Sequence, residues 1–206
     1  MIAIILTAIA FFVPLFIQKS IGPLDFWWWM TANLVLLIGI AAMTDTVFRR
    51  SVSDDLRTGL LKKIGLGLLS ALALYGVFFV GNTISRKLFP FSAQNIAAVY
   101  AFKSGVAPAR VWLLITLVIG PGEELFWRGY LQRALALRFG PVTGYLLATT
   151  LYASVHAGNG NAMLVLAAFV CGFAWGWLYL RFGSTLLNAV SHTTWDLAVF
   201  LLFPFT

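Results

Sequence analysis

Two acidic residues and one basic residue that could do chemistry stand together in an otherwise apolar stretch: Glu123, Glu124 and Arg128. An ionisable side chain at membrane depth costs about 2.5–3.5 kcal/mol even on a lenient scale, so such groups indicate function. On a helix, Glu124 and Arg128 are four residues apart and share a face, whereas Glu123 points about 100° away. We therefore expect Glu124 to pair with Arg128 and Glu123 to stand apart. A structural ion pair beside a solvated glutamate is the alternative.

Both histidines of the sequence also lie in apolar stretches, one near the end of its segment and one within it. His156 ends one such segment, and Asn188, His192 and Asp196 recur every four residues and form a polar stripe on one helix face. Alone, each histidine is more typical of hydrogen bonding between helices than of catalysis. Because none of these groups can comfortably face lipid, we expect Glu123, His156, His192 and Asp196 to converge on one water-accessible interior chamber.

This combination of side chains is typical of hydrolysis. A carboxylate can accept a proton from water, imidazole can share that task, and imidazole beside an amide or acid can donate hydrogen bonds to a developing oxyanion. Glu123, His156 and His192 are also a plausible zinc ligand set with an open fourth position. The sequence contains no His-Glu-x-x-His motif, no serine- or cysteine-centred nucleophile motif and no glycine-rich phosphate loop.

The composition indicates which elements must position these residues. Of 206 residues, 61% are hydrophobic and 10% are charged, against about 45–50% and 25% in soluble domains, and the mean hydropathy is +0.91. These values exclude a soluble or disordered chain. Since a spanning helix needs about 20 apolar residues, we expect an all-α membrane bundle of about seven (roughly six to eight) transmembrane helices. We expect a single transmembrane domain over residues 1–206.

The apolar segments give the expected positions of these helices. A charged loop that contains Arg49, Arg50 and Arg57 is expected between the second and third spans, and a short interfacial helix over Ser92–Lys103. Pro121 predicts a kink ahead of the glutamates. The predicted spans are residues 1–18, 26–43, 64–81, 108–138, 141–155, 161–180 and 184–203.

The distribution of charge predicts topology more than a charged partner. The net charge is +7, but the 14 Lys and Arg residues are scattered through loops, which argues against nucleic acid as a partner. Loops on the side of the N-terminus carry more Lys and Arg than those opposite, so the positive-inside rule favours a cytoplasmic N-terminus. We expect a multi-pass protein of a bacterial or archaeal cell membrane.

Taken together, these residues resemble the CPBP intramembrane proteases. This family, named for CAAX proteases and bacteriocin-processing enzymes and also called the Abi family, includes the Ras-converting enzyme. Its signatures are Glu-Glu-x-x-x-Arg, aromatic-x-x-x-His and His-x-x-x-Asn/Asp, and all three occur here in the family's order within residues 110–206. The matching residues are Glu123, Glu124 and Arg128, then Tyr152 and His156, and then His192 and Asp196.

The resemblance implies an endopeptidase that cuts within or beside the membrane. Glu123 with His156 would activate water, and His192 with Asp196 would hold the oxyanion. Glu124 with Arg128 would orient the helix and Glu123. The implied substrate is a prenylated, leader or membrane-anchored peptide, and membrane lipid is the other implied partner of the protein.

The resemblance leaves two features of the mechanism open. The family has been described both as metalloproteases and as metal-independent glutamate proteases; we expect the glutamate mechanism without a cofactor, with zinc as the alternative. Asp196 stands where Ras-converting enzymes have asparagine, so it can donate a hydrogen bond only when protonated. Orienting His192 or binding a metal are its alternative roles.

Two further classes of function fit the same polar residues. One is a non-catalytic membrane regulator or scaffold with the protease fold. The other is a proton-coupled transporter, because intramembrane Glu, His and Asp also form proton relays. A transporter would favour two related halves with matching interrupted helices, and Pro121 has no counterpart in the other half of the sequence.

Overall fold

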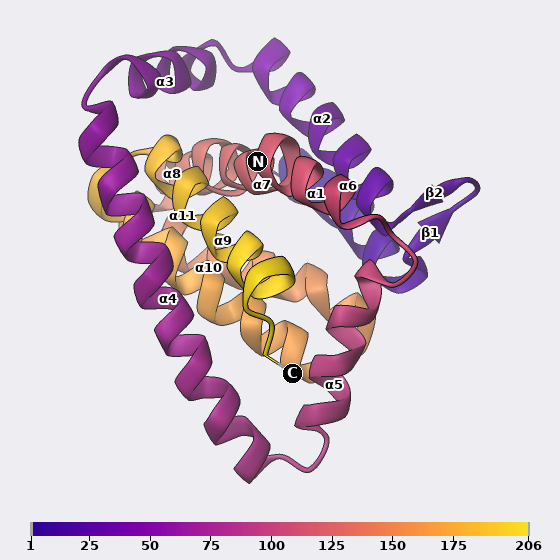
Figure 1. The fold of residues 1–206 in the computed structure, drawn as a ribbon. Helices are drawn as coiled ribbons and strands as arrows, with labels where there is room; N and C mark the ends of the chain where they lie inside the picture. Colours follow the sequence, from indigo (N-terminus) through magenta and orange to yellow (C-terminus); the bar gives the residue numbers. More distant parts are fainter. Residues whose placement is uncertain (1, 206) are drawn as a thin grey trace.

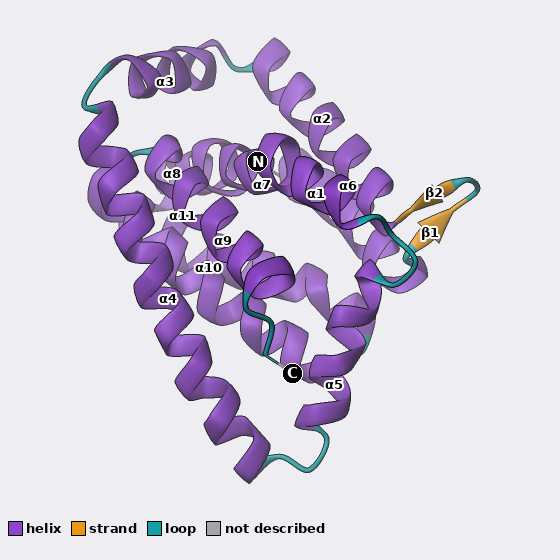
Figure 2. Ribbon diagram, in the orientation of Figure 1, coloured by secondary structure: helices purple, strands orange, loops and turns teal. Residues whose placement is uncertain are grey.

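The protein is a bundle of helices with one small β-hairpin (Figures 1 and 2). The structure is a computed structural model that describes residues 2–205. The hairpin pairs β1 (Ser20–Ile21) with β2 (Leu24–Asp25) in antiparallel fashion between the first two helices. The predicted all-α helical membrane bundle is thereby confirmed, and the short hairpin is an addition that the sequence analysis did not predict.

The helices follow the predicted order along the chain. The first half contains α1 (Ile2–Gln18), α2 (Phe26–Thr44), α3 (Thr46–Arg57), α4 (Leu60–Leu88) and α5 (Ser92–Tyr100). The second half contains α6 (Pro108–Leu114), α7 (Gly120–Glu124), α8 (Arg133–Phe139), α9 (Pro141–His156), α10 (Ala162–Phe182) and α11 (Thr185–Leu197). Single 3₁₀ turns follow α5 and α9, at Ala101–Lys103 and Ala157–Asn159. Among residues 2–205, three segments are π-helical: Ile115–Ile119, Leu125–Gln132 and Ala198–Leu202.

Polar side chains and glycines set where these helices begin and end. The side chains of Asp25, Asn161 and Ser184 each accept a hydrogen bond from a backbone N–H in the first turn of the helix that follows. Such caps satisfy backbone donors that have no partner inside the helix. Between α8 and α9, Gly140 has a φ of 92°, which a residue with a side chain rarely adopts, so the chain turns there.

Three of the described helices are long and apolar enough to cross a membrane. These are α2, α4 and α10. The pair Ser92–Lys103 and Pro108–Phe139, which bends by 91°, provides a fourth if it is counted as one broken span. The remaining helices are shorter, so a count of seven spans stays a prediction. The helix expected over Ser92–Lys103 is present, as α5 and the 3₁₀ turn after it.

The charged segment between α2 and α4 is a helix, and the prediction of a loop there is wrong. Asp45 caps α3 by accepting a hydrogen bond from the backbone N–H of Phe48 at 2.8 Å. Phe48 is buried against the bundle and its ring meets that of Tyr130 edge-on. The charges of this segment led to the prediction of a loop. An N-cap followed by one buried aromatic residue is enough to fix a helix across the end of the bundle (Figure 1).

The predicted fourth span is helical without a break from Pro108 to Phe139, but it alternates between α-helical and π-helical segments. The π-helical turn Ile115–Ile119 directly precedes the turn that contains Pro121. A proline lacks the N–H that an α-helix needs, and a wider turn accommodates that gap. The expected disturbance ahead of the glutamates therefore takes the form of a π turn, a feature often found at functional sites.

Close helix contacts bring α11 next to the glutamates. A Cβ atom on Gly67 of α4 would lie 2.8 Å from Val190. A Cβ on Gly120 of α7 would collide with Thr193. Since neither glycine has a side chain, α11 lies tightly between α4 and α7. On the other side of the site, a Cβ on Gly176 of α10 would lie 2.8 Å from the ring of Tyr145, so α9 and α10 also pack closely.

Candidate active site

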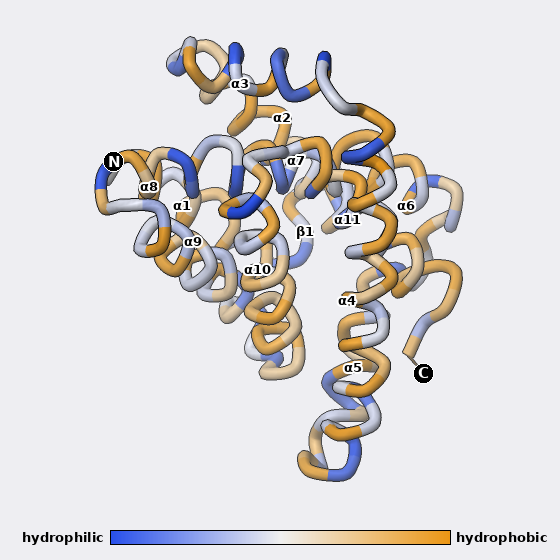
Figure 3. Tube along the Cα trace, turned by 90° about the vertical axis from the view of Figure 1, so that its left-hand side faces the viewer, coloured by the Kyte–Doolittle hydropathy of each residue, from blue (hydrophilic) through white to orange (hydrophobic). Residues whose placement is uncertain are grey.

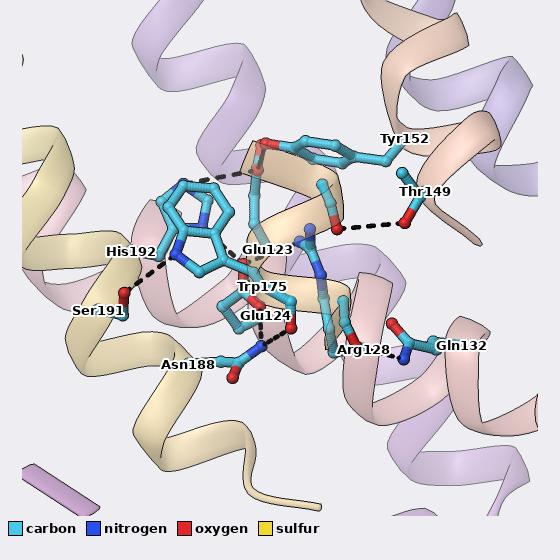
Figure 4. Close-up of polar contacts among 12 residues, drawn as sticks. Glu123, Glu124, Arg128, Gln132, Thr149, Tyr152, Trp175, Asn188, Ser191 and His192 are labelled. Atoms are coloured by element: carbon cyan, nitrogen blue, oxygen red, sulfur yellow. Dashed lines mark hydrogen bonds and ion pairs between the residues drawn. The ribbon is translucent and has the colours of Figure 1, made fainter. Parts of the chain in front are cut away.

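Glu124 is the centre of a buried polar network (Figure 4). Its side chain is fully buried. Oε1 accepts hydrogen bonds from Arg128 Nη1 at 2.8 Å and from His192 Nδ1 at 2.7 Å, and Oε2 accepts one from Asn188 Nδ2 at 3.0 Å. The predicted pair with Arg128 is present. The network also joins the fourth span to α11, since Asn188 and His192 are one turn apart on that helix.

The bond to Glu124 determines which nitrogen of His192 carries a proton. A carboxylate paired with an arginine can only accept, so Nδ1 of His192 must donate. The other nitrogen, Nε2, is then directed at two more carboxyl groups: it lies 3.8 Å from Glu123 Oε2 and 3.5 Å from Asp196 Oδ2. Glu124 therefore fixes the position of the imidazole and keeps a proton on Nδ1, and leaves Nε2 available for chemistry.

Trp175 of α10 holds the ring of His192 from one face. The two rings are stacked, with centroids 3.7 Å apart and planes at 18° (Figure 4). The indole N–H donates to Ser191 Oγ at 3.1 Å, and the backbone carbonyl of Trp175 accepts from Asn188. The imidazole is thus fixed by one hydrogen bond in its plane and one aromatic face against it.

Glu123 makes fewer contacts than its neighbour. Its Oε2 accepts a hydrogen bond from the hydroxyl of Tyr152 at 2.9 Å, and within residues 2–205 it makes no ion pair with Arg128. The two glutamates, one residue apart, therefore differ in role. Glu124 is occupied by three donors, whereas Glu123 keeps acceptor capacity for a molecule in the site.

His156 reaches the site through Tyr152. Its Nδ1 lies 2.7 Å from the backbone carbonyl of Tyr152; a carbonyl can only accept, so Nδ1 donates and Nε2 is the lone-pair nitrogen of the neutral ring. The ring packs against Phe16 of α1 at 4.3 Å. Among the described residues, His156 makes no direct hydrogen bond to Glu123 or His192. It lines the same cavity as the carboxylates without bonding to them.

One cavity of about 280 Å³ joins the predicted catalytic side chains. Glu123, His156, His192 and Asp196 all line it, together with Tyr152. Most of its wall is apolar and comes from helices of both halves of the chain. Examples of these wall residues are Phe26, Trp27 and Met30 of α2 and Val77 and Phe78 of α4. The four side chains expected to converge therefore do so, in the wall of one mostly apolar cavity.

Several contacts in the site could not be found from the sequence. The resemblance suggested that Glu124 orients Glu123, but its side-chain bonds among residues 2–205 go to Arg128, Asn188 and His192. Trp175 was missed because an aromatic residue in an apolar span carries no polar signal. Asn188 did carry one, as the first member of the polar stripe on α11.

The donor types near the cavity suit zinc, but their arrangement is not a ligand set. Glu123, His156 and His192 offer one carboxylate and two imidazoles, which zinc accepts. Within residues 2–205, however, no three His, Cys, Asp or Glu side chains are grouped closely enough to hold a metal ion. The residues present therefore do not fit a preformed zinc site.

The second half of the chain matches one known family. Residues 105–198 match the family model described as "Type II CAAX prenyl endopeptidase Rce1-like". The matched range includes Glu123, Glu124, Arg128, His156, His192 and Asp196. No curated protein and no solved structure matches the chain. The match confirms the family resemblance seen in the three motifs.

Proposed function

We propose that this protein is an intramembrane endopeptidase with Glu123 as its general base, because residues 105–198 match the Rce1-like family model of CAAX prenyl endopeptidases. The family indicates a hydrolase of the CAAX-protease type that acts on a membrane-associated peptide. The apolar helices and the family also indicate a membrane protein. The observation that carries the finer proposal is the convergence of Glu123, His156, His192 and Asp196 on one apolar cavity.

In the proposed reaction, a water molecule bound between Glu123 and His156 attacks the scissile carbonyl. The free oxygen of the Glu123 carboxylate accepts one proton from the water as its oxygen bonds to the carbonyl carbon. His156 offers its Nε2 lone pair as a second acceptor for the same water. The hydroxyl of Tyr152, which donates to Glu123 Oε2, keeps the carboxylate oriented toward the cavity. When the intermediate collapses, the carbon–nitrogen bond breaks and the proton held by Glu123 passes to the leaving amine.

His192 would stabilise the oxyanion. Because Nδ1 already donates to Glu124, this role requires His192 to be an imidazolium with a second proton on Nε2, which it donates to the developing negative charge. Asp196 lies 3.5 Å from the same Nε2. We propose that Asp196 orients His192, because an ionised carboxylate in that place can accept but not donate.

The apolar wall suits a substrate that carries hydrocarbon, and a prenylated, leader or membrane-anchored peptide would meet this requirement. Mass spectrometry of membrane peptides from cells that express the wild-type protein or Glu123→Gln would report both activity and cleavage site. Peptides with new termini should appear only with the wild type, while Asp54→Asn, which removes an exposed carboxylate on α3, should behave as the wild type. Identical peptide sets with Glu123→Gln would leave the non-catalytic scaffold as the better account.

The metal-free mechanism can be tested separately. A chelator should leave cleavage by the purified protein unchanged, and metal analysis should find less than one zinc ion per chain. Inhibition by the chelator that is reversed by added zinc would overturn the glutamate mechanism while leaving the proposed peptidase activity intact.

A further inference from the structure

One end of the bundle gathers cationic side chains around α3. They lie on α3, at the start of α4, at both ends of α8 and at the end of α10. These segments are held together because Asp45 of the α3 cap pairs with Arg133, and Asp55 of α3 accepts hydrogen bonds from the start of α11. These cations are Arg49, Arg50, Arg57, Lys62, Lys63, Arg133, Arg138 and Arg181. Within residues 2–205, only Lys63 and Arg133 of this group pair with an acid. The end of the bundle therefore holds a surplus of positive charge.

The two faces of α3 have different partners. Phe48 is 3% exposed and lies where a Cβ atom on Gly129 would come within 3.2 Å of its ring, so that face is against the bundle. At 100° per residue, Arg50 and Arg57 point about 160° and 180° away from Phe48, and both are exposed. Figure 3 shows several hydrophilic positions along α3, with hydrophobic positions between them. These two arginines thus face outward without an acidic partner among the described residues.

Exposed apolar side chains flank this cationic face. Val47 and Leu56 lie at its two edges on α3, 59% and 51% exposed, and Leu61 at the start of α4 is 88% exposed. In water such a patch is unfavourable, whereas acyl chains at the edge of a bilayer would cover it. A basic face between apolar edges is the pattern of helices that lie in the membrane interface. An acidic protein or a nucleic acid would satisfy the arginines but leave the apolar edges exposed.

We propose that α3 is a binding surface for anionic phospholipids. Arg50 and Arg57 contact the headgroup phosphates, and Val47, Leu56 and Leu61 lie against the upper part of the acyl chains. Arg49 takes less part, because it already donates to the backbone carbonyl of Ala42. The binding free energy rises in proportion to the number of juxtamembrane arginines, so the affinity for anionic lipid rises about fivefold with each charge.

Native mass spectrometry of the purified full chain in detergent tests the proposal without any substrate. The wild type should retain phosphatidylglycerol in preference to phosphatidylcholine. The double variant Arg50→Gln/Arg57→Gln should bind phosphatidylglycerol roughly 25-fold more weakly, at about fivefold for each of the two charges. The matched control is Arg86→Gln/Lys87→Gln, which removes two charges from the other end of α4 and should bind as the wild type does. Arg50→Lys/Arg57→Lys should restore binding.

Thermal unfolding with and without added phosphatidylglycerol provides a second measurement. A lipid that binds the folded state raises its melting temperature, so the wild type and the control should be stabilised and Arg50→Gln/Arg57→Gln should not. Glu123→Gln should bind lipid normally, which separates this proposal from the proposed function. Unchanged lipid preference in Arg50→Gln/Arg57→Gln, equal loss in the control, or preference for a hexaglutamate peptide over the lipid would overturn it.

Discussion

The adjacent residues Glu123 and Glu124 should respond differently to the same substitution by glutamine. Glu124→Gln removes the charge that compensates Arg128, which is 2% exposed, and an uncompensated buried charge costs about 3–5 kcal/mol. The new amide also places an N–H₂ group among donors that already face this position. At roughly 2–4 °C per kcal/mol for a chain of this size, the melting temperature should fall by about 6–20 °C.

Glu123→Gln should leave stability almost unchanged and remove activity. The amide oxygen can still accept the hydrogen bond from Tyr152, so the free energy of unfolding should change by less than about 1 kcal/mol. An amide cannot accept a proton from water, so the cleavage rate should fall by at least about 100-fold. Thermal unfolding followed by tryptophan fluorescence, together with peptide cleavage by the same samples, measures both effects. Equal melting temperatures for the two variants would refute this assignment of roles.

Three further substitutions distinguish residues that act in the catalytic site from a residue that stabilises the fold. Trp175→Leu should lower kcat with little change in KM because the ring against His192 is lost, whereas Trp175→Phe should recover most of kcat; equal losses would refute the stacking role. In His156→Asn the amide N–H₂ can replace Nδ1 but nothing replaces Nε2, so cleavage should be lost while the melting temperature stays within a few degrees; retained cleavage would remove His156 from the mechanism. Burial raises the pKa of Asp55, but hydrogen bonds from Lys63 and the N–H of Leu186 outweigh it and hold the pKa below its usual value. The stabilisation from Asp55 is therefore present above the unfolded pKa of about 3.9 and is lost as pH falls through the lower folded pKa. Asp55→Asn should cost about 1–3 kcal/mol at pH 7, and unfolding curves should show this difference shrinking below about pH 4; a difference that does not depend on pH would contradict the argument.

The sequence predicted the helices well where local chemistry sets their ends. Pro108, Gly140 and Ser184 each mark a boundary that the structure keeps within a residue or two. It failed at α3, because charge suggested a loop while one buried aromatic residue fixed a helix. It also missed the hairpin before α2, whose strands are two residues each and too short to show an alternating pattern.

For the site, the sequence predicted which residues take part but not which hydrogen bonds join them. Polar residues in apolar spans stand out, so Glu123, Glu124, His192 and Asp196 could all be named. The bond between Glu124 and His192 joins residues 68 positions apart, and it depends on how α11 packs against α7. That contact is set by Gly120 and Thr193, whose types carry no signal of catalysis. Long-range packing of this kind cannot be derived from one sequence.

Cleavage of a membrane peptide by the purified wild-type protein and by purified Glu123→Gln, in the same detergent and at the same concentration, tests the central claim most directly. The account predicts a new amino terminus with the wild type and a rate at least about 100-fold lower with the variant, at matched melting temperatures. Cleavage at the wild-type rate by folded Glu123→Gln would contradict it.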